Sequence, residues 1–328
     1  MIVKYIFAFL IAFCVAMAFA PLVFKLSKKI KAQQTILHYV KEHEGKQGTP
    51  TMGGLIFILP AIVVALLFFG NDYMLAIIAL AVFLAYAILG FLDDFIKVKF
   101  KQNLGLRAYQ KILGQLGIAL IIAIFVYNFV GSQIIIPFAN IELDLGIFII
   151  PLIIFVYVAV VNSVNLIDGL DGLCTSSRIC YLFFLSAILI LTSTNLSGQA
   201  LAETQNLITT NYAVLGALFA FLFFNTFPAK IFMGDTGSLG LGGYIATVSI
   251  FTKNILLIPI LGFVFVVTAV SDIIQVLYYK KTKKRVFKMA PLHHHFQMSG
   301  VHENRVVFSY FLVGLILNLI VCALYIIL

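Results

Sequence analysis

The chain has 328 residues, of which 62% are hydrophobic and 11% charged, and its mean hydropathy is +1.09. Soluble globular domains are closer to half apolar and a quarter charged, so this composition excludes an ordinary soluble protein and predicts a polytopic membrane protein. The four cysteines form neither a CxxC pair nor a metal-ligand spacing, so we expect no disulfide framework and no cysteine metal site.

Apolar runs divide the chain into about ten segments that we predict to be membrane-spanning helices of a single domain, residues 1–328. Crossing a bilayer core takes about 20 apolar residues per helix. The first run is followed, rather than preceded, by its basic cluster, the reverse of a signal peptide, so we expect a permanent span. Alternating segments within residues 131–146 predict a small β-hairpin. The predicted spans are 3–24, 52–70, 73–92, 112–130, 147–166, 173–192, 207–224, 237–252, 255–279 and 306–327.

Basic residues lie almost entirely on one side of the predicted bundle. Of the 22 lysines and arginines, all but Lys4 and Lys253 lie in, or at the edge of, loops that follow odd-numbered spans. By the positive-inside rule these loops are cytoplasmic and both termini are extracytoplasmic. The formal net charge of +9 therefore follows from topology, and we expect no nucleic-acid partner. A basic cytoplasmic face does attract anionic nucleotides and lipid headgroups.

The unusual polar motifs all lie in the predicted cytoplasmic loops. The first is "LGFLDDFIK", in which Asp93 and Asp94 are adjacent at the end of the third predicted span. Lys97 lies four residues after Asp93, so an ion pair on a continuing helix accounts for one acid but not for both. Adjacent carboxylates stay ionised only beside cations; otherwise one of them takes up a proton. We therefore interpret the pair as a functional site, as expected for acids at a membrane edge.

Two further motifs add carboxylates and amides to the same face. In "NSVNLIDGLDG" a spacing of three places Asn162, Asn165 and Asp168 on one stripe of a helix, and Asp171 follows three residues later. In "FMGDTGSLGLGG", Asp235 precedes the eighth predicted helix, where an acid is first of all an N-cap. Free N–H groups at a helix start also bind phosphate, and Mg²⁺ is typically held by one or two carboxylates with substrate phosphates. Beside the other acids, we favour the metal role for Asp235.

The fifth predicted cytoplasmic loop contains "APLHHHFQMSG". His293, His294 and His295 are consecutive, so they cannot all bind one zinc ion. We expect one or two of them to contact a pyrophosphate or to move protons near neutral pH. In the first loop, "GTPTMGG" lacks the GK[ST] of a P-loop, although Lys46, five residues before Thr51, is near enough in sequence to reach a phosphate.

Together these motifs resemble the signatures of the phospho-N-acetylmuramoyl-pentapeptide-transferase family, within the polyprenyl-phosphate N-acetylhexosamine-1-phosphate transferase superfamily. "GTPTMGG" and "PLHHHF" are the specific signatures, whereas the paired aspartates and the "NxxNxxDG" pattern are shared across the superfamily. The resemblance implies an all-α polytopic enzyme of the bacterial cytoplasmic (inner) membrane with its active site on the cytoplasmic face. It implies transfer of phospho-MurNAc-pentapeptide from its UDP carrier to undecaprenyl phosphate, with release of UMP and formation of lipid I in peptidoglycan synthesis. It also implies Mg²⁺ as cofactor and leaves a homodimer open.

The resemblance further implies roles for the residues at matching positions. The implied catalytic residues are Asp93, Asp94, Asp235 and His293, with Asp235 as the metal ligand. The implied substrate-binding residues are Lys46, Thr51, Lys97, Lys111, Asn162, Asn165, Asp168, Asp171, Asn225, Phe232, His294 and His295.

Two departures and two alternatives accompany this interpretation. Gln297 stands where the family usually has Glu, and Val301 stands where a Trp commonly follows, so the pentapeptide contacts of this loop are open. A sister transferase that moves GlcNAc-1-phosphate from UDP-GlcNAc shares the acids and differs chiefly in the histidine loop. An ion-coupled transporter would place acids near mid-membrane, where Asp272 is the only acid well inside a predicted span.

Overall fold

The computed structural model describes residues 1–29, 48–100, 105–139 and 141–327. These residues are helical nearly throughout, as predicted, because a helix satisfies its interior backbone N–H and C=O groups without water. The helices are α1 (Ile2–Lys29), α2 (Leu55–Leu67), α3 (Met74–Phe100), α4 (Ala108–Phe125) with a π-helical turn (Val126–Val130), α5 (Ile149–Leu166), α6 (Leu173–Thr192), α7 (Gly198–Asn225), α8 (Gly234–Phe251), α9 (Ile258–Leu261), α10 (Phe263–Thr282), α11 (Leu292–Gln297) and α12 (Glu303–Ile327). Short 3₁₀ turns span Gly146–Phe148, Ser193–Asn195 and Ile255–Leu257, and the two strands are β1 (Gln133–Ile136) and β2 (Ile141–Asp144).

Within the described residues, 8 helical segments are long and apolar enough to cross a membrane. Nine of the ten predicted spans each overlap one helix, although α2 and α8 are not among these eight; the ninth predicted span, 255–279, is instead divided between a 3₁₀ turn, α9 and α10. α2 has only 13 residues, and α8 has 18 residues with a glycine-rich first half. An all-α, multi-pass membrane protein is therefore confirmed, whereas the count of ten spans and the sidedness of the termini stay predictions.

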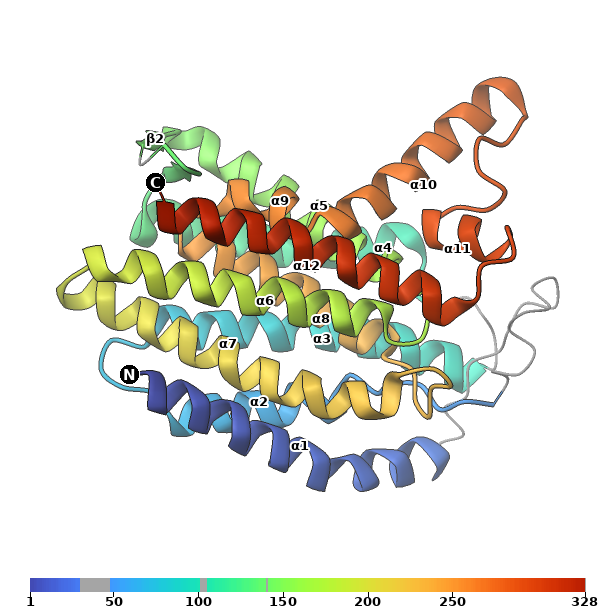
Figure 1. Cartoon of the computed structure of the whole chain (residues 1–328), viewed down its shortest axis with the longest axis horizontal. Coiled ribbons are helices and arrows are strands. Elements are labelled where there is room, and N and C mark those ends of the chain that lie inside the picture. The colour runs from blue at the N-terminus through green and yellow to red at the C-terminus, as the bar shows by residue number, and fades with distance from the viewer. Residues whose placement is uncertain (30–47, 101–104, 140, 328) are drawn as a thin grey trace.

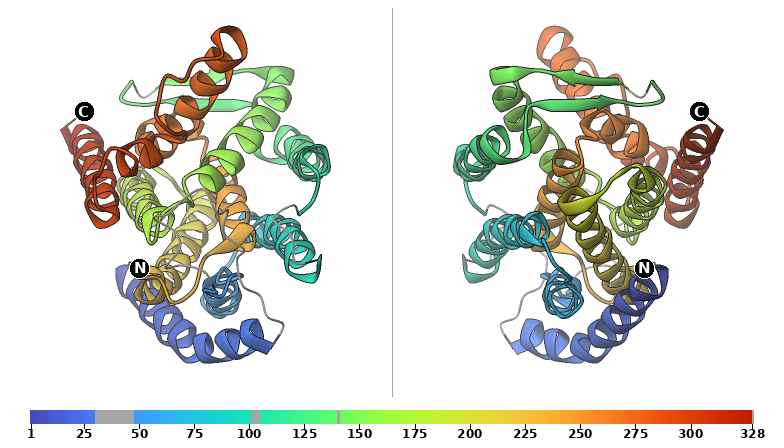
Figure 2. Two further views of the ribbon diagram at one scale, coloured as in Figure 1. Left: turned by 90° about the vertical axis from the view of Figure 1, so that its right-hand side faces the viewer. Right: turned by 90° about the vertical axis from the view of Figure 1, so that its left-hand side faces the viewer.

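α8 lies at the centre of the bundle rather than at its lipid-facing surface. Every residue from Thr236 to Phe251 is buried, and the two end-on views of Figure 2 show the other helices arranged around it. Glycines allow this close packing, since the Phe83 ring lies 3.2 Å from where a Cβ of Gly240 would be. Small residues at helix contacts are typical of membrane bundles, where backbones approach closely. The packing brings the start of α8 beside the last turns of α3.

Both chain ends lie at the same end of the bundle as the hairpin, and the C-terminal end is the nearer of the two to it (Figure 1). The predicted hairpin is confirmed: β1 and β2 are antiparallel, with Gln133 opposite Asp144. It is fastened to the turn after α8, because Lys253 pairs with Glu142 at 3.0 Å and the Ile135 N–H donates to the Lys253 carbonyl at 2.9 Å. The end of α3, the start of α8 and α11 lie at the opposite end of the bundle (Figure 1).

Large apolar side chains cover the outer faces of the helices. α10 leans away from the other helices in Figure 1, and its Ile273 and Leu277 are largely exposed. Exposed aliphatic residues are costly in water but suit a surface that lies against lipid tails. The outer surface is therefore consistent with the composition of the chain.

Candidate active site

Asp93 lies inside the last part of α3 and is 1% exposed. Its Oδ2 pairs with the Lys97 ammonium at 2.6 Å, one helical turn along α3, and with Lys111 on α4 at 3.2 Å. Its Oδ1 accepts the backbone N–H of Leu106 at 2.7 Å. The predicted Asp93–Lys97 pair is thus confirmed, and the carboxylate also connects α3 to the start of α4.

Asp94 has a different environment, although it is adjacent in sequence and 3% exposed. Its Oδ1 accepts the backbone N–H of Asp235 at 3.1 Å. Its Oδ2 accepts the N–H of Thr236 at 2.9 Å and its hydroxyl at 2.7 Å. Asp94 therefore supplies from α3 the cap that the first turn of α8 needs, since those N–H groups have no partner within their own helix. The helix cap that the sequence suggests at Asp235 is provided mainly by another chain segment.

Asp235, at the start of α8, completes the acidic group. Its Oδ2 pairs with Lys111 at 2.5 Å and Lys97 at 3.1 Å, and its Oδ1 accepts the side-chain N–H of Asn165 at 2.9 Å. Burial favours the neutral acid, but the two ammonium groups outweigh it and hold the pKa of Asp235 well below its usual range. Asp235 is therefore ionised at neutral pH.

The three carboxylates can hold one metal ion together. Oxygen atoms from Asp93, Asp94 and Asp235 lie within 4.8 Å of one another. Carboxylate oxygens are the donors that hard divalent cations prefer, so the residues fit such an ion. The ammonium groups of Lys97 and Lys111 contact these carboxylates and add positive charge beside them. We call these five residues the acid–lysine cluster.

Two glycines allow the backbones to approach closely at this cluster. A Cβ on Gly90 of α3 would collide with the carbonyl oxygen of Asp235, so no larger residue fits there without a backbone shift. Gly234 has φ +73, a left-handed conformation that glycine adopts at no steric cost. A Cβ on Gly234 would lie 2.9 Å from the Thr51 hydroxyl and 2.5 Å from Asp94 Oδ2. Thr51, a predicted substrate residue, is thereby placed next to the acids.

The predicted polar stripe of α5 divides between two places. Asn165 reaches the cluster and also donates to Ser238 Oγ at 2.9 Å. Asn162 instead exchanges hydrogen bonds with Gln115 of α4, at 2.7 and 3.4 Å. Asp168 follows the end of α5; burial, followed by the charges of Asp235 and Asp94, raises the pKa of its carboxyl to about 8. Asp168 is therefore electrostatically coupled to the cluster.

Asp171 and Asn225 connect loops next to the cluster. The Asp171 carboxylate accepts the N–H of Ala229 at 2.9 Å, and its own N–H donates to Glu303 of α12 at 2.7 Å. Asn225 accepts the hydroxyl of Thr175 at 2.8 Å and donates to the carbonyl of Ile231 at 3.1 Å. These contacts position the segment that leads to Phe232, which is half-buried.

The three consecutive histidines face different neighbours. His293 is fully buried, and its Nε2 lies against Gly169, whose Cβ position is 2.9 Å from the Nε2 of His294. The loop after α5 and the histidine loop therefore meet. His295 turns instead to its own loop, where its Nδ1 accepts the N–H of Lys288 at 3.1 Å. The expectation that one or two of them contact a pyrophosphate or move protons stays a prediction.

Sequence reasoning missed several polar residues around the cluster. Glu303 could have been noticed in the sequence, since an acid in the first turn of a helix interacts with the positive end of the helix dipole. Gln115 could have been noticed as well, because a polar residue inside an apolar span is expected to have a specific partner. The sequence predicts Thr236 and Ser238 only as capping groups of α8, whereas in the structure they contact Asp94 and Asn165. Lys46 lies outside the described residues.

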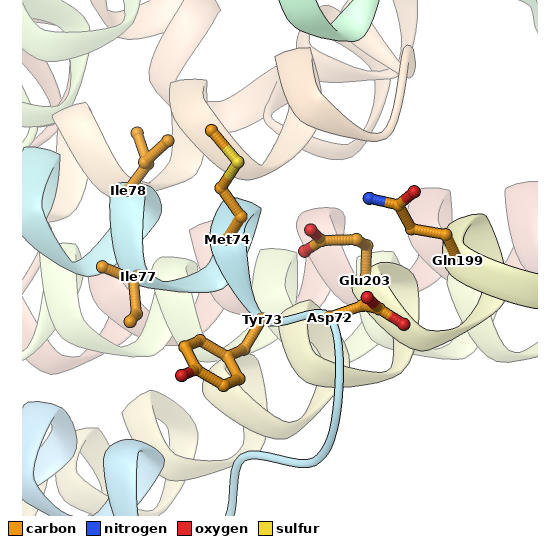
Figure 3. A pocket seen from close by; sticks show the side chains of 7 residues that line it. All are labelled: Asp72, Tyr73, Met74, Ile77, Ile78, Gln199 and Glu203. Carbon is orange, nitrogen blue, oxygen red and sulfur yellow. The ribbon is translucent and has the colours of Figure 1, made fainter.

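A cavity of about 490 Å³ lies at the other end of the bundle, and its lining includes Asp72, Tyr73 and Glu203 (Figure 3). The Glu203 carboxylate accepts the N–H of Leu75 at 2.9 Å and so caps the start of α3. Asp72 and Asp93 are separated by nearly the full length of α3, roughly 30 Å at 1.5 Å per residue. The cavity is therefore separate from the acid–lysine cluster.

Similarity to known proteins identifies the family. A family model described as "Glycosyl transferase family 4" matches residues 74–253, and "Phospho-N-acetylmuramoyl-pentapeptide-transferase signature 1" matches residues 46–58. The phospho-N-acetylmuramoyl-pentapeptide-transferase of Thermoanaerobacter sp. (strain X514) is 45% identical over 318 residues, 96% of this chain and 97% of the relative. That of Clostridioides difficile (strain 630) is 40% identical over 314 residues, 94% of each chain. The chain belongs to the phospho-N-acetylmuramoyl-pentapeptide-transferase family.

The two matched regions of this transferase meet at the site. Residues 46–58 include Gly53 and Gly54, whose N–H groups donate to the carbonyls of Phe232 and Met233 at 2.9 and 3.0 Å. Residues 74–253 run from α3 to the end of α8 and contain all three clustered acids. The histidine loop lies beyond both matches, and its contact with Gly169 brings it to the same place.

Proposed function

We propose that this transferase carries out its reaction at the acid–lysine cluster. It transfers phospho-MurNAc-pentapeptide from UDP-MurNAc-pentapeptide to undecaprenyl phosphate, so that UMP leaves and lipid I forms. The observation that carries the proposal is the convergence of three carboxylates and two ammonium groups at one end of membrane helices. A nucleotide substrate from water and a phosphate on a lipid chain meet at such a position.

The charges of the cluster suit the joining of two phosphates. Both reactants are anionic, so the main task is to position them and to reduce their repulsion. Lys97 and Lys111 are held at one place by shared contacts with Asp93 and Asp235, all between 2.5 and 3.2 Å. Their side chains are 32% and 22% exposed, so an entering phosphate can reach them.

Mg²⁺ is the proposed cofactor, with Asp235 as its principal ligand and Asp93 beside it. When bound, the ion adds positive charge next to the phosphate oxygens. Asp235 is ready to bind a cation because its lowered pKa keeps it ionised.

The two adjacent acids have separate roles in this proposal. Both oxygens of Asp94 are engaged by the first turn of α8, so Asp94 holds Asp235 in place. Asp93 Oδ2 faces the two lysines, and is therefore the oxygen placed to interact with the lipid phosphate. In this proposal Asp94 positions the start of α8, and Asp93 interacts with the reacting phosphate.

The remaining assignments concern substrate binding and the setting in the membrane. The residues that we assign to surround the phosphates of the two substrates are Thr51, Lys97, Lys111, Asn165 and Asp168. We assign His293 to a catalytic position on the nucleotide and sugar side of the site. The other residues that we assign to that side are Asn162, Asp171, Asn225, Phe232, His294 and His295. The site faces the cytoplasm in the bacterial inner membrane, in accord with the one-sided distribution of lysines and arginines. A homodimer stays a prediction.

The test is a transfer assay on the purified full-length chain. UMP release and lipid I formation are measured with undecaprenyl phosphate and either UDP-MurNAc-pentapeptide or UDP-GlcNAc. We expect turnover with the first donor only, since the histidine loop offers contacts beyond uridine and pyrophosphate. Comparable turnover of UDP-GlcNAc would instead assign the chain to the sister transferases. Absence of transfer with both donors would refute the proposed reaction.

A further inference from the structure

A chain of hydrogen bonds runs from α12 to the second histidine. The Glu303 carboxylate accepts the N–H of Asp171 through Oε1 at 2.7 Å. Its Oε2 lies 3.5 Å from the side-chain nitrogen of Gln297. The Gln297 side-chain oxygen lies 2.8 Å from Nδ1 of His294. Gln297 thus stands between a carboxylate and an imidazole.

The chemistry of these groups sets the direction of each bond. An ionised carboxylate only accepts hydrogen bonds, so the Gln297 amide turns its NH₂ toward Glu303 and its oxygen toward His294. An oxygen there requires a donor, which makes Nδ1 the protonated nitrogen of the ring. We propose that Gln297 and Glu303 together hold His294, whenever its ring is neutral, in the tautomer with the proton on Nδ1. Gln297 is in this sense a positioning residue.

The tautomer decides what His294 does at the site. With Nδ1 protonated, Nε2 carries the lone pair, and Nε2 is the atom on the side of Gly169 and the neighbouring Asp168. Neutral His294 therefore accepts a hydrogen bond there, from a hydroxyl or amide N–H of the substrate rather than from a phosphate oxygen. This inference rests on the proposed function for the identity of the substrate, whereas the tautomer itself does not depend on it.

The groups around His294 explain why an amide is used at position 297. His293 lies beside it, with ring centroids 4.3 Å apart. The Glu303 carboxylate contacts the far side of the Gln297 amide. Asp168 directly precedes Gly169 in the sequence, and Asp171 follows it by two residues. From α10 comes the neutral hydroxyl of Ser271, which accepts the N–H of Leu292 at 3.0 Å. A carboxylate at 297 would bond the same Nδ1–H but would stabilise the imidazolium ion, whose Nε2 is a donor. Gln297 keeps the orientation of the ring without favouring its charged form.

The direct test is the protonation state of His294 in the ¹⁵N spectrum of histidine-labelled full-length protein. The chain has 6 histidines, and His294→Asn identifies the resonances of interest. At slightly alkaline pH we expect Nδ1 protonated and Nε2 unprotonated. Glu303→Gln, which lets the Gln297 amide turn over, should yield a mixture of tautomers. A wild-type ring protonated on Nε2, or an unchanged tautomer in Glu303→Gln, would overturn the proposal.

A kinetic test uses the pH profile of kcat/KM for the donor substrate. In Gln297→Glu the acidic limb of the profile should move up by about 1–2 pH units, because a neighbouring carboxylate favours the imidazolium. Gln199→Glu, which makes the same change beside the distant cavity, is the matched control and should leave the profile in place. An unmoved acidic limb in folded Gln297→Glu contradicts the positioning role. If the wild type transfers nothing, the proposed function fails, and the ¹⁵N spectrum still decides the tautomer.

Discussion

Replacing Asp94 by Asn should separate the two adjacent acids by their effect on stability. The Asp94 carboxylate accepts two bonds on Oδ2 and one on Oδ1, all from the first turn of α8. An amide has one acceptor oxygen, so in Asp94→Asn at least one backbone N–H of α8 faces an NH₂ group. Hydrogen bonds to a charged partner contribute about 1.5–3 kcal/mol each, and a lost helix cap costs about 1 kcal/mol.

We therefore expect Asp94→Asn to lower the free energy of unfolding by about 1–3 kcal/mol. At about 2 °C per kcal/mol for a chain of this size, the Tm falls by about 2–6 °C. Asp93→Asn should change the Tm less, because its amide oxygen can still accept the Leu106 N–H and Lys97 and Lys111 keep Asp235 as a partner. Both substitutions should abolish most transfer activity.

The assay is thermal unfolding of purified protein in detergent, followed by a thiol-reactive dye. The chain has no Trp, but Cys174 and Cys180 are buried free thiols that react when the bundle opens. Asp72→Asn, at an exposed acid beside the distant cavity, is the control for loss of a charge. An Asp94→Asn Tm equal to that of the wild type would refute the assignment of Asp94 as the cap of α8.

Three further predictions follow from the same contacts. Complete chelation should abolish transfer, measured as UMP release, and added Mg²⁺ should restore it; turnover that persists in chelator would exclude a metal at the acid–lysine cluster. Gly90→Ala should lower the Tm by an amount equivalent to about 1–3 kcal/mol, because its Cβ meets the Asp235 backbone. The control Gly117→Ala, whose Cβ would have nothing within 4 Å, should be neutral or stabilising. Equal Tm values for the two variants would contradict the close contact of α3 and α8. Burial and nearby charges raise the pKa of Asp168 in the native state to about 8, whereas its pKa in the unfolded chain is about 3.9. Between these two pH values the carboxyl is protonated in the native state and ionised in the unfolded state, so the free energy of unfolding falls as the pH rises. The Tm of the wild type relative to Asp168→Asn, measured in chelator, should therefore decline from pH 5 to 8 and then level off, and a pH-independent difference would show that the Asp168 carboxyl is not shifted.

Much of the fold and most of the site residues could be predicted from local features of the sequence. Apolar runs of about 20 residues form membrane helices wherever they occur, since backbone groups in lipid must bond within their own segment. The alternating segments before α5 predicted the hairpin for an equally local reason. The motifs around Asp93, Asn165 and Asp235 identified the acids because charged and amide groups are rare and costly in such a chain.

The tertiary structure alone decided how the identified residues divide their work. The spacing predicted the pair of Asp93 with Lys97, but only the packing added Lys111 to that pair and made Asp94 the cap of α8. Asn162 and Asn165 lie on the same helical stripe, but only Asn165 meets Asp235. The contacts of Asp94 with Thr236, of Asn165 with Asp235 and of Asn162 with Gln115 each join residues more than 40 positions apart, and such partners are set by which helices pack together and how closely. Local spacing determined that polar groups would gather at one end of the bundle, and packing around the glycines of α3 and α8 determined which of them touch.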